Sequence, residues 1–206
     1  MSYDRLTPDN AAVLFVDHQT GLSNGVQDQS VPEYVTAVTA LATVAKNFNL
    51  PSVITTSAAD GPNGPVLPAI SGLLPDAPVI HRPGNINAWD NAEFVDAVKK
   101  AGRKKLIVAG VSTEVCVAFV ALSAIQDGYD VYAVIDASGT WNKLVQEVAI
   151  ARMVQAGIKP ITWVAVGAEL LNDWRAPQGQ AHAQVMSEHL PFYGNLFASF
   201  QAAKGN

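Results

Sequence analysis

The sequence predicts an α/β fold, in which one domain forms three layers with helices on both faces of a six-stranded, mostly parallel sheet. Short apolar runs rich in β-branched residues alternate with longer amphipathic segments, and such alternation is typical of parallel sheets. Most residues of these runs are apolar, as in strands that are buried on both faces. The length of 206 residues suits a single domain, which we assign to residues 1–206.

Six apolar runs form the predicted strands, and we expect them in the sheet order 3-2-1-4-5-6. Their ranges, in chain order, are Ala11–Asp17, Ser52–Ser57, Val79–His81, Lys105–Gly110, Tyr129–Ile135 and Pro160–Val166. This order makes the first and fourth strands neighbours at the point where the strand order reverses. Ligands of open α/β sheets bind at that point, outside the carboxyl ends of the strands.

Four segments between the strands have the apolar spacing of amphipathic or buried helices. They are Val35–Asn47, Ala92–Ala101, Thr113–Gln126 and Val145–Ala156. Between the second and third strands, Ala58–Pro68 holds three Pro and two Gly. That composition predicts a long loop, of the kind that often covers a site.

Residues 167–206 follow the predicted sixth strand as a C-terminal helical extension. We expect helix from Gln178 to Ala203 with a break at Pro191. Its large apolar residues are Leu170, Leu171, Trp174, Leu190, Phe192, Tyr193, Leu196, Phe197 and Phe200. Because so many apolar groups exceed the patches that monomers usually expose, we expect a homo-oligomer that buries them. The alternative is that the extension folds back over a sheet edge.

Composition excludes several classes of function. The net charge of −5 and the lack of a basic run argue against nucleic acid as a partner. No apolar stretch is long enough to predict a membrane span, and no glycine-rich motif for a nucleotide cofactor is present. The single cysteine excludes an internal disulfide and fits a reducing compartment, so we expect a cytoplasmic protein whose partner is a small-molecule substrate.

Three candidate catalytic residues lie at or just after predicted strand ends. Asp17 ends the first strand, Arg82 follows the third, and Cys116 lies in a strand-to-helix turn after the fourth. We expect the helix N-terminus to favour the Cys116 thiolate, and a neighbouring carboxylate can accept a thiol proton. Each residue also has a structural explanation: an inert buried thiol, a carboxylate that caps a turn, and a surface ion pair.

Motifs around these residues extend over most of the chain. They are AAVLFVDHQTGL at 11–22, TTSAADGPNGP at 55–65, HRPGNINAWDN at 81–91, LIVAGVSTEVCVAF at 106–119, DASGT at 136–140 and ELLNDWR at 169–175. With these motifs the sequence resembles the isochorismatase-like cysteine hydrolases, and within them the YcaC-type branch. The resemblance implies an α/β hydrolase that assembles into large rings, with an octamer favoured.

The resemblance also implies a catalytic triad of Asp17, Arg82 and Cys116. Most members of the family carry lysine at the position of Arg82, and arginine cannot usefully release its proton. We therefore expect an electrostatic role for Arg82. Nicotinamidases of the family bind metal through an Asp-x-His pair and further histidines after the second strand. The segment TTSAADGPNGP holds no histidine, so we predict neither a metal site nor another cofactor.

Further site features rest on the same resemblance. It implies a cis peptide bond between Val111 and Ser112, and an oxyanion hole formed by the backbone amides of Ser112 and Cys116. By analogy with the family, Asn87 and Trp89 are expected to bind substrate.

Together these observations predict a cysteine-dependent hydrolase that cleaves a small amide-like substrate through a covalent thioester (acyl-enzyme) intermediate. True isochorismatases cleave a vinyl ether and lack the cysteine nucleophile, so Cys116 argues against that reaction. Two alternatives stay open. A cysteine at a helix N-terminus beside an arginine is also typical of a peroxide-reactive sensor, and the chain could be a catalytically idle oligomeric scaffold.

Overall fold

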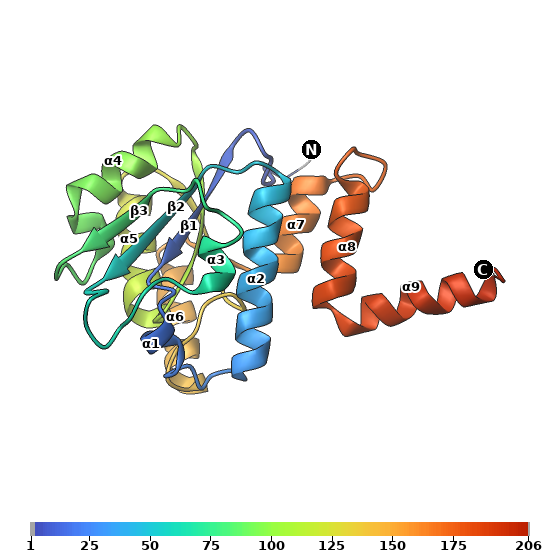
Figure 1. The fold of residues 1–206 in the computed structure, drawn as a ribbon. Helices are drawn as coiled ribbons and strands as arrows, with labels where there is room; N and C mark the ends of the chain where they lie inside the picture. Colours follow the sequence, from blue (N-terminus) through green and yellow to red (C-terminus); the bar gives the residue numbers. More distant parts are fainter. Residues whose placement is uncertain (1–2, 206) are drawn as a thin grey trace.

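The computed structural model describes residues 3–205, and over that range the chain forms a six-stranded sheet in the order β3-β2-β1-β4-β5-β6 (Figure 1). Neighbouring strands are parallel throughout, so the predicted fold class and strand order are confirmed. Residues 1, 2 and 206 of the predicted domain lie outside the described residues. The strands are β1 (Ala11–Val16), β2 (Ser52–Ser57), β3 (Val79–Arg82), β4 (Lys105–Gly110), β5 (Asp130–Val134) and β6 (Lys159–Ile161).

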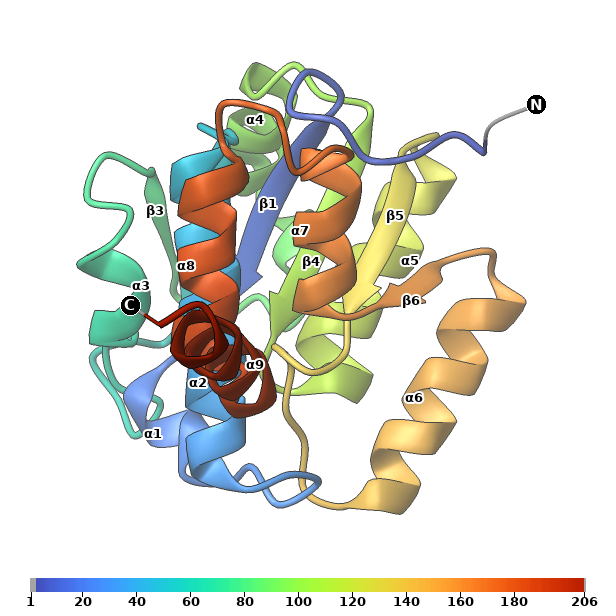
Figure 2. The ribbon, with the colours of Figure 1, turned by 90° about the vertical axis from the view of Figure 1, so that its right-hand side faces the viewer.

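Helices cover both faces of the sheet and complete the three expected layers (Figure 2). The helices on one face are α2 (Val31–Asn47), α7 (Trp163–Leu171) and α8 (Gly179–His189). Those on the other face are α4 (Ala92–Lys100), α5 (Ala118–Gln126) and α6 (Lys143–Gln155). Short helical turns lie in the connections: α1 (Thr20–Ser23), α3 (Pro68–Ser71), η1 (Ala88–Asp90) and η2 (Thr113–Val117).

The central strand β1 is buried along its whole length, and its side chains alternate between two cores. Val13 and Phe15 pack with residues of α2 and α7. Leu14 and Val16 pack with residues of α4 and α5. Burial on both faces explains why the strand is apolar at every position, and it holds the end of β1 firmly in place.

The prediction of a strand over Pro160–Val166 was wrong beyond Ile161. The chain leaves the sheet there, and Thr162 caps helix α7 by accepting the Ala165 N–H at 3.4 Å. The carboxylate of Asp136 accepts the Trp163 N–H at 3.0 Å, which reinforces the helix start. Periodicity alone cannot distinguish a short apolar strand from the start of a buried helix. The expected start of the C-terminal extension at residue 167 therefore falls inside α7.

Helix α2 begins four residues before the predicted start at Val35. Ser30 accepts the Glu33 N–H at 3.3 Å, and the Glu33 carboxylate accepts the Ser30 N–H at 3.1 Å. This reciprocal pair is a capping box. Pro32 lies in the first turn, where its missing N–H costs no hydrogen bond.

The C-terminal extension divides into two helices, as the break at Pro191 predicts. Helix α8 packs against α2 and α7, and His182 is buried there beside the rings of Phe48 and Trp174. Helix α9 (Pro191–Ala203) instead projects away from the body of the molecule (Figure 1). None of its residues is buried. Across residues 3–205, no helix combines the length and hydropathy needed to cross a membrane.

Candidate active site

A cavity of about 240 Å³ lies at the carboxyl ends of β1 and β4, where the strand order reverses. This is the position at which open α/β sheets bind ligands. Asp17 and Cys116, which are 99 residues apart in the chain, both line it. The polar residues of its lining are Asp17, Ser57, Asn63, Ser112, Glu114 and Cys116.

Asp17 follows directly after β1, which ends at Val16 rather than at the predicted Asp17. Its backbone has a φ of 56°, a left-handed conformation that aspartate adopts more readily than most residues. The residue is fully buried. Oδ1 accepts a hydrogen bond from Arg82, whereas Oδ2 has no hydrogen-bond partner among the described residues. One carboxylate oxygen is therefore fixed and the other is free to take a proton.

Arg82 ends β3 and is buried with its guanidinium fully engaged. Nη2 donates to Asp17 Oδ1, and Nε donates to the Thr55 hydroxyl at 2.9 Å. Nη1 donates to the carbonyls of Asn85 and, at 3.3 Å, Ile86. Arg82 does not line the cavity, and among the cavity-lining residues it forms its ion pair with Asp17.

Burial raises the pKa of the Cys116 thiol, and the neighbouring Asp17 carboxylate raises it further. The opposing effects of the Ser112 backbone and of Arg82 on this pKa are smaller. The backbone at the start of the helix favours the thiolate, as expected, but burial and Asp17 outweigh this effect. Cys116 lies in the π-helical turn η2, before the α-helix proper begins at Ala118. The thiol is neutral at rest beside its potential base.

The Asp17 carboxyl has a raised pKa as well, because burial outweighs the stabilising charge of Arg82. Arg82 and the Cys116 thiol both favour the ionised carboxylate, and their effects limit the rise. The arrangement thus holds a carboxylate with elevated proton affinity next to a neutral thiol. Such a pair is suited to transferring one proton between its members.

The peptide bond between Val111 and Ser112 is cis, and it lies in the turn between β4 and η2. Val111 donates its N–H to the Val16 carbonyl at 3.1 Å, and Thr113 donates to the Gly139 carbonyl at 3.0 Å. The Ser112 N–H between them donates to no backbone carbonyl within residues 3–205, and it lies close enough to the Cys116 thiol to lower its pKa. Ser112 lines the cavity together with Cys116, so this amide is available to an oxygen atom bound there.

Close packing of β1 against β4 leads into this turn. A Cβ atom on Gly110 would lie 2.1 Å from the Val16 carbonyl oxygen, so no larger residue fits without moving the backbone. The ends of the two strands that carry Asp17 and the Cys116 turn are therefore held at a fixed distance.

Gln19 ties the loop over the cavity to the end of β1. Its Nε2 donates to the carbonyls of Ser57 at 3.1 Å and Gly64 at 2.6 Å, and its Oε1 accepts the Ser57 N–H at 2.9 Å. Asn63 also donates to the Ser57 carbonyl, at 2.8 Å. The sequence flagged this loop, Ala58–Pro68, as a possible cover for a site, but gave no signal for the role of Gln19.

The structure does not bring Asn87 and Trp89, the expected substrate-binding residues, to this cavity. Asn87 caps η1 by accepting the Trp89 N–H at 3.0 Å and donates to Ser123 at 3.0 Å. Trp89 donates from Nε1 to Asp127 at 2.9 Å and packs against the rings of Phe94 and Tyr129. Both side chains are used in holding η1 against α5.

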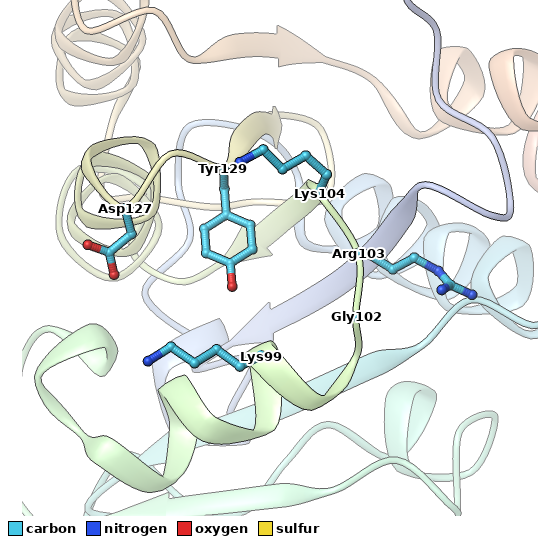
Figure 3. Close-up of a pocket in the computed structure, with 6 residues that line it drawn as sticks. All are labelled: Lys99, Gly102, Arg103, Lys104, Asp127 and Tyr129. Carbon is cyan, nitrogen blue, oxygen red and sulfur yellow. The ribbon is translucent and has the colours of Figure 1, made fainter.

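Asp127 and Tyr129 belong to a second, open hollow, which Figure 3 shows. It lies where α4 and α5 end and β4 and β5 begin. This is the amino end of the strands, whereas Cys116 lies at their carboxyl end. Lys99 and Lys104 flank the Tyr129 ring, with Lys104 Nζ 5.8 Å from its centroid. Neither Asp17 nor Cys116 lines this hollow. Within the described part of the chain, no three His, Cys, Asp or Glu side chains cluster as metal ligands would.

Comparisons with known proteins agree with this geometry. The Isochorismatase domain family model matches residues 11–165. The probable hydrolase YcaC of Escherichia coli K12 is 52% identical over 198 residues, which cover 96% of this chain and 95% of the relative. The secreted isochorismatase effector Isc1 of Phytophthora sojae is 27% identical over 195 residues, covering 90% and 89%.

Two solved structures each match the chain with a TM-score of 0.95 and 52% identity, covering 98% of this chain and 99% of theirs. One is YcaC from Pseudomonas aeruginosa with hexane-2,5-diol and covalent acrylamide. The other is E. coli YcaC, an octameric hydrolase of unknown specificity. The family match covers the whole sheet and every residue of the expected triad, and the chain belongs to the isochorismatase family.

Proposed function

We propose that this chain is a hydrolase that cleaves a small amide-like substrate, with Cys116 as the nucleophile and Asp17 as the base. The free Oδ2 of the buried Asp17 carboxylate, in the same cavity as the Cys116 thiol, carries the proposal. The Cys116 thiol interacts with this carboxylate and favours its ionised form, and proton transfer from the thiol gives the free oxygen a use. The covalent acrylamide in the Pseudomonas aeruginosa relative supports the proposal, because it demonstrates that this relative reacts covalently with a small electrophilic amide.

In the first half of the reaction, Asp17 takes the thiol proton while Sγ forms a bond to the substrate carbonyl carbon. The raised pKa of the thiol means that deprotonation accompanies the attack rather than preceding it. The amides of Ser112 and Cys116 would stabilise the carbonyl oxygen as it gains negative charge. Collapse of this intermediate breaks the carbon–nitrogen bond, and the leaving amine takes the proton from Asp17.

In the second half, water hydrolyses the thioester. Asp17 accepts a proton from the water as its oxygen attacks the acyl carbon, and the acid product leaves. The departing sulfur recovers the proton from Asp17, which restores the starting state. Arg82 keeps the carboxylate oriented and limits the rise of its pKa, so it acts as a positioning residue in this scheme.

The two alternatives fit the site less well. A peroxide sensor needs a thiol with a low pKa that ionises readily, whereas burial and Asp17 raise the pKa of Cys116. An idle scaffold has no use for a buried carboxylate placed against a buried thiol. Because the mechanism needs a reduced thiol, we place the activity in the cytoplasm, where thiols stay reduced.

We further propose that the chain assembles as a homo-oligomer, with residues 167–206 contributing to the interface and an octamer favoured. Helix α9 projects from the domain, and Phe192, Leu196, Phe197 and Phe200 on it are at least half exposed. The E. coli relative, 52% identical, is octameric. Burying these side chains against another copy would remove an apolar surface that monomers seldom expose.

The experiment for the proposed function is a screen of simple amides for release of ammonia or amine. Wild-type protein should hydrolyse at least one of them, and Cys116→Ala should not, while its circular dichroism stays unchanged. Turnover of the same amide by folded Cys116→Ala would contradict the proposal. A sensor or a scaffold would give no turnover with the wild-type protein.

A further inference from the structure

The cavity beside Cys116 contains a second carboxylate, Glu114, that the proposed mechanism does not use. Its Oε2 accepts a hydrogen bond from the Thr140 hydroxyl at 2.6 Å. Oε1 makes no hydrogen bond and the side chain forms no ion pair within the part of the chain that the structure describes. Glu114 is thus held at one oxygen while the other remains available to a ligand.

The electrostatic character of the cavity is negative. Asp17 and Glu114 both line it, and the described residues of its lining include no lysine, arginine or histidine. Arg82 does not compensate them both, since it is buried behind Asp17 and its nitrogen atoms already donate to protein oxygens. A carboxylate on the substrate would therefore meet two like charges, against the single positive charge of Arg82 behind Asp17.

An aromatic side chain lies next to the Glu114 contact. Trp141 follows Thr140 directly and lines the same cavity. Gly25 makes room for its ring, because a Cβ atom there would lie 2.4 Å from Trp141 Cζ3. Leu22 and Ile86 contribute apolar side chains to the lining of the cavity. A carboxylate and an indole ring in the lining of one cavity are a combination that favours a cation bearing N–H groups.

Building on the proposed function, we propose that Glu114 and Trp141 make this site selective for positively charged substrates, whose ammonium or similar N–H-bearing group lies beside the scissile amide. Glu114 Oε1 accepts a hydrogen bond from that group, and the Trp141 ring borders it. Substrates that carry a carboxylate at the same place are excluded. The volume of about 240 Å³ limits the substrate to a small molecule.

The single cysteine allows this selectivity to be measured without a known substrate. Two methanethiosulfonate reagents of similar size, 2-aminoethyl and 2-sulfonatoethyl, form a mixed disulfide with the thiol and release methanesulfinate. Their rates with Cys116 are followed by intact-protein mass and divided by their rates with a free small thiol. The wild-type protein should prefer the ammonium reagent by roughly tenfold or more, because the charge difference acts at short range in a partly buried site.

Glu114→Gln should reduce that preference severalfold. The amide oxygen of glutamine can still accept from Thr140, so the change removes the charge and keeps the contact. Glu114→Asp, which keeps the charge, should retain most of the preference. Asp76→Asn is the matched control for net charge. Asp76 is exposed in the loop before β3, at the amino end of the strands, whereas the cavity lies at their carboxyl ends. Its replacement should therefore leave the preference unchanged.

A wild-type protein that shows no preference, or prefers the sulfonate reagent, would overturn the inference without any variant. So would a preference that persists in Glu114→Gln, or one that Asp76→Asn lowers equally. Hydrolysis plays no part in this measurement. A charge preference without amide turnover would therefore contradict the proposed function alone, and amide turnover without a charge preference would contradict only the selectivity.

Discussion

Replacing Arg82 with methionine should strongly destabilise the fold, because the change leaves the Asp17 carboxylate buried without its cation. Neither side chain of this pair is exposed to solvent. Methionine fills similar space without a charge. The substitution therefore removes the guanidinium and its hydrogen bonds with little loss of packing.

The expected loss in the free energy of unfolding is about 3–5 kcal/mol, the range found when one partner of a buried ion pair is removed. The Thr55 hydroxyl and the carbonyls of Asn85 and Ile86 also lose their donor, which adds to the cost. Since proteins are usually stable by only about 5–15 kcal/mol, the variant should unfold at a much lower temperature.

The loss should also depend on pH. Burial already raises the pKa of Asp17 against the opposing effect of Arg82, so removing Arg82 raises this pKa further. The folded variant then keeps a proton that the unfolded chain releases above about pH 4. Consequently the variant should lose stability relative to wild type as the pH rises through the raised pKa, and regain it as the pH falls.

Thermal unfolding at one fixed protein concentration, near pH 5 and near pH 8, measures both effects. The double variant Asp17→Asn, Arg82→Met buries no charge at this pair and should recover part of the loss. A loss below about 1 kcal/mol, the size typical of an exposed ion pair, would refute the reasoning. An equal loss at the two pH values would refute the assignment to Asp17.

Three further predictions concern the base, the loop and the tail. Asp17→Asn should abolish amide turnover and yet lower the pKa of the Cys116 thiol, because the carboxylate is one cause of its rise; thiolate absorbance across a pH titration checks the second effect. Gln19→Ala removes three hydrogen bonds to the backbone around the loop and should raise KM more than it lowers kcat, with faster proteolysis within 58–68. Deleting residues 178–206 should break the assembly to a mass near that of one chain, by light scattering coupled to size exclusion.

The sequence was sufficient to predict the sheet, because its strands are defined by local composition. Ser52–Ser57 and Lys105–Gly110 begin and end at the residues predicted from their β-branched and apolar composition. The error at Pro160–Val166 arose where an apolar run continues from β6 into a buried helix. Only the Thr162 and Asp136 contacts decide where the strand ends, and the second of these joins separate parts of the chain.

The site was predictable in its main residues and less so in its chemistry. Asp17 and Cys116 share a cavity because topology brings the ends of β1 and β4 together. The pKa of the thiol depends on burial and on Asp17, and neither effect follows from the position of Cys116 in a turn. Glu114 is next but one to Cys116 in the sequence, but its contact with Thr140 and its place in the cavity require the fold.

The most direct test of the proposed chemistry is to trap the acyl-enzyme. Wild-type protein is mixed with an amide that it hydrolyses, quenched in acid during turnover, and examined by mass spectrometry of the intact chain and of its peptides. The mechanism predicts an adduct with the mass of the acyl group on the peptide that contains Cys116, and no adduct in Asp17→Asn. Turnover without an adduct under conditions that preserve thioesters, or an adduct on another residue, would contradict it.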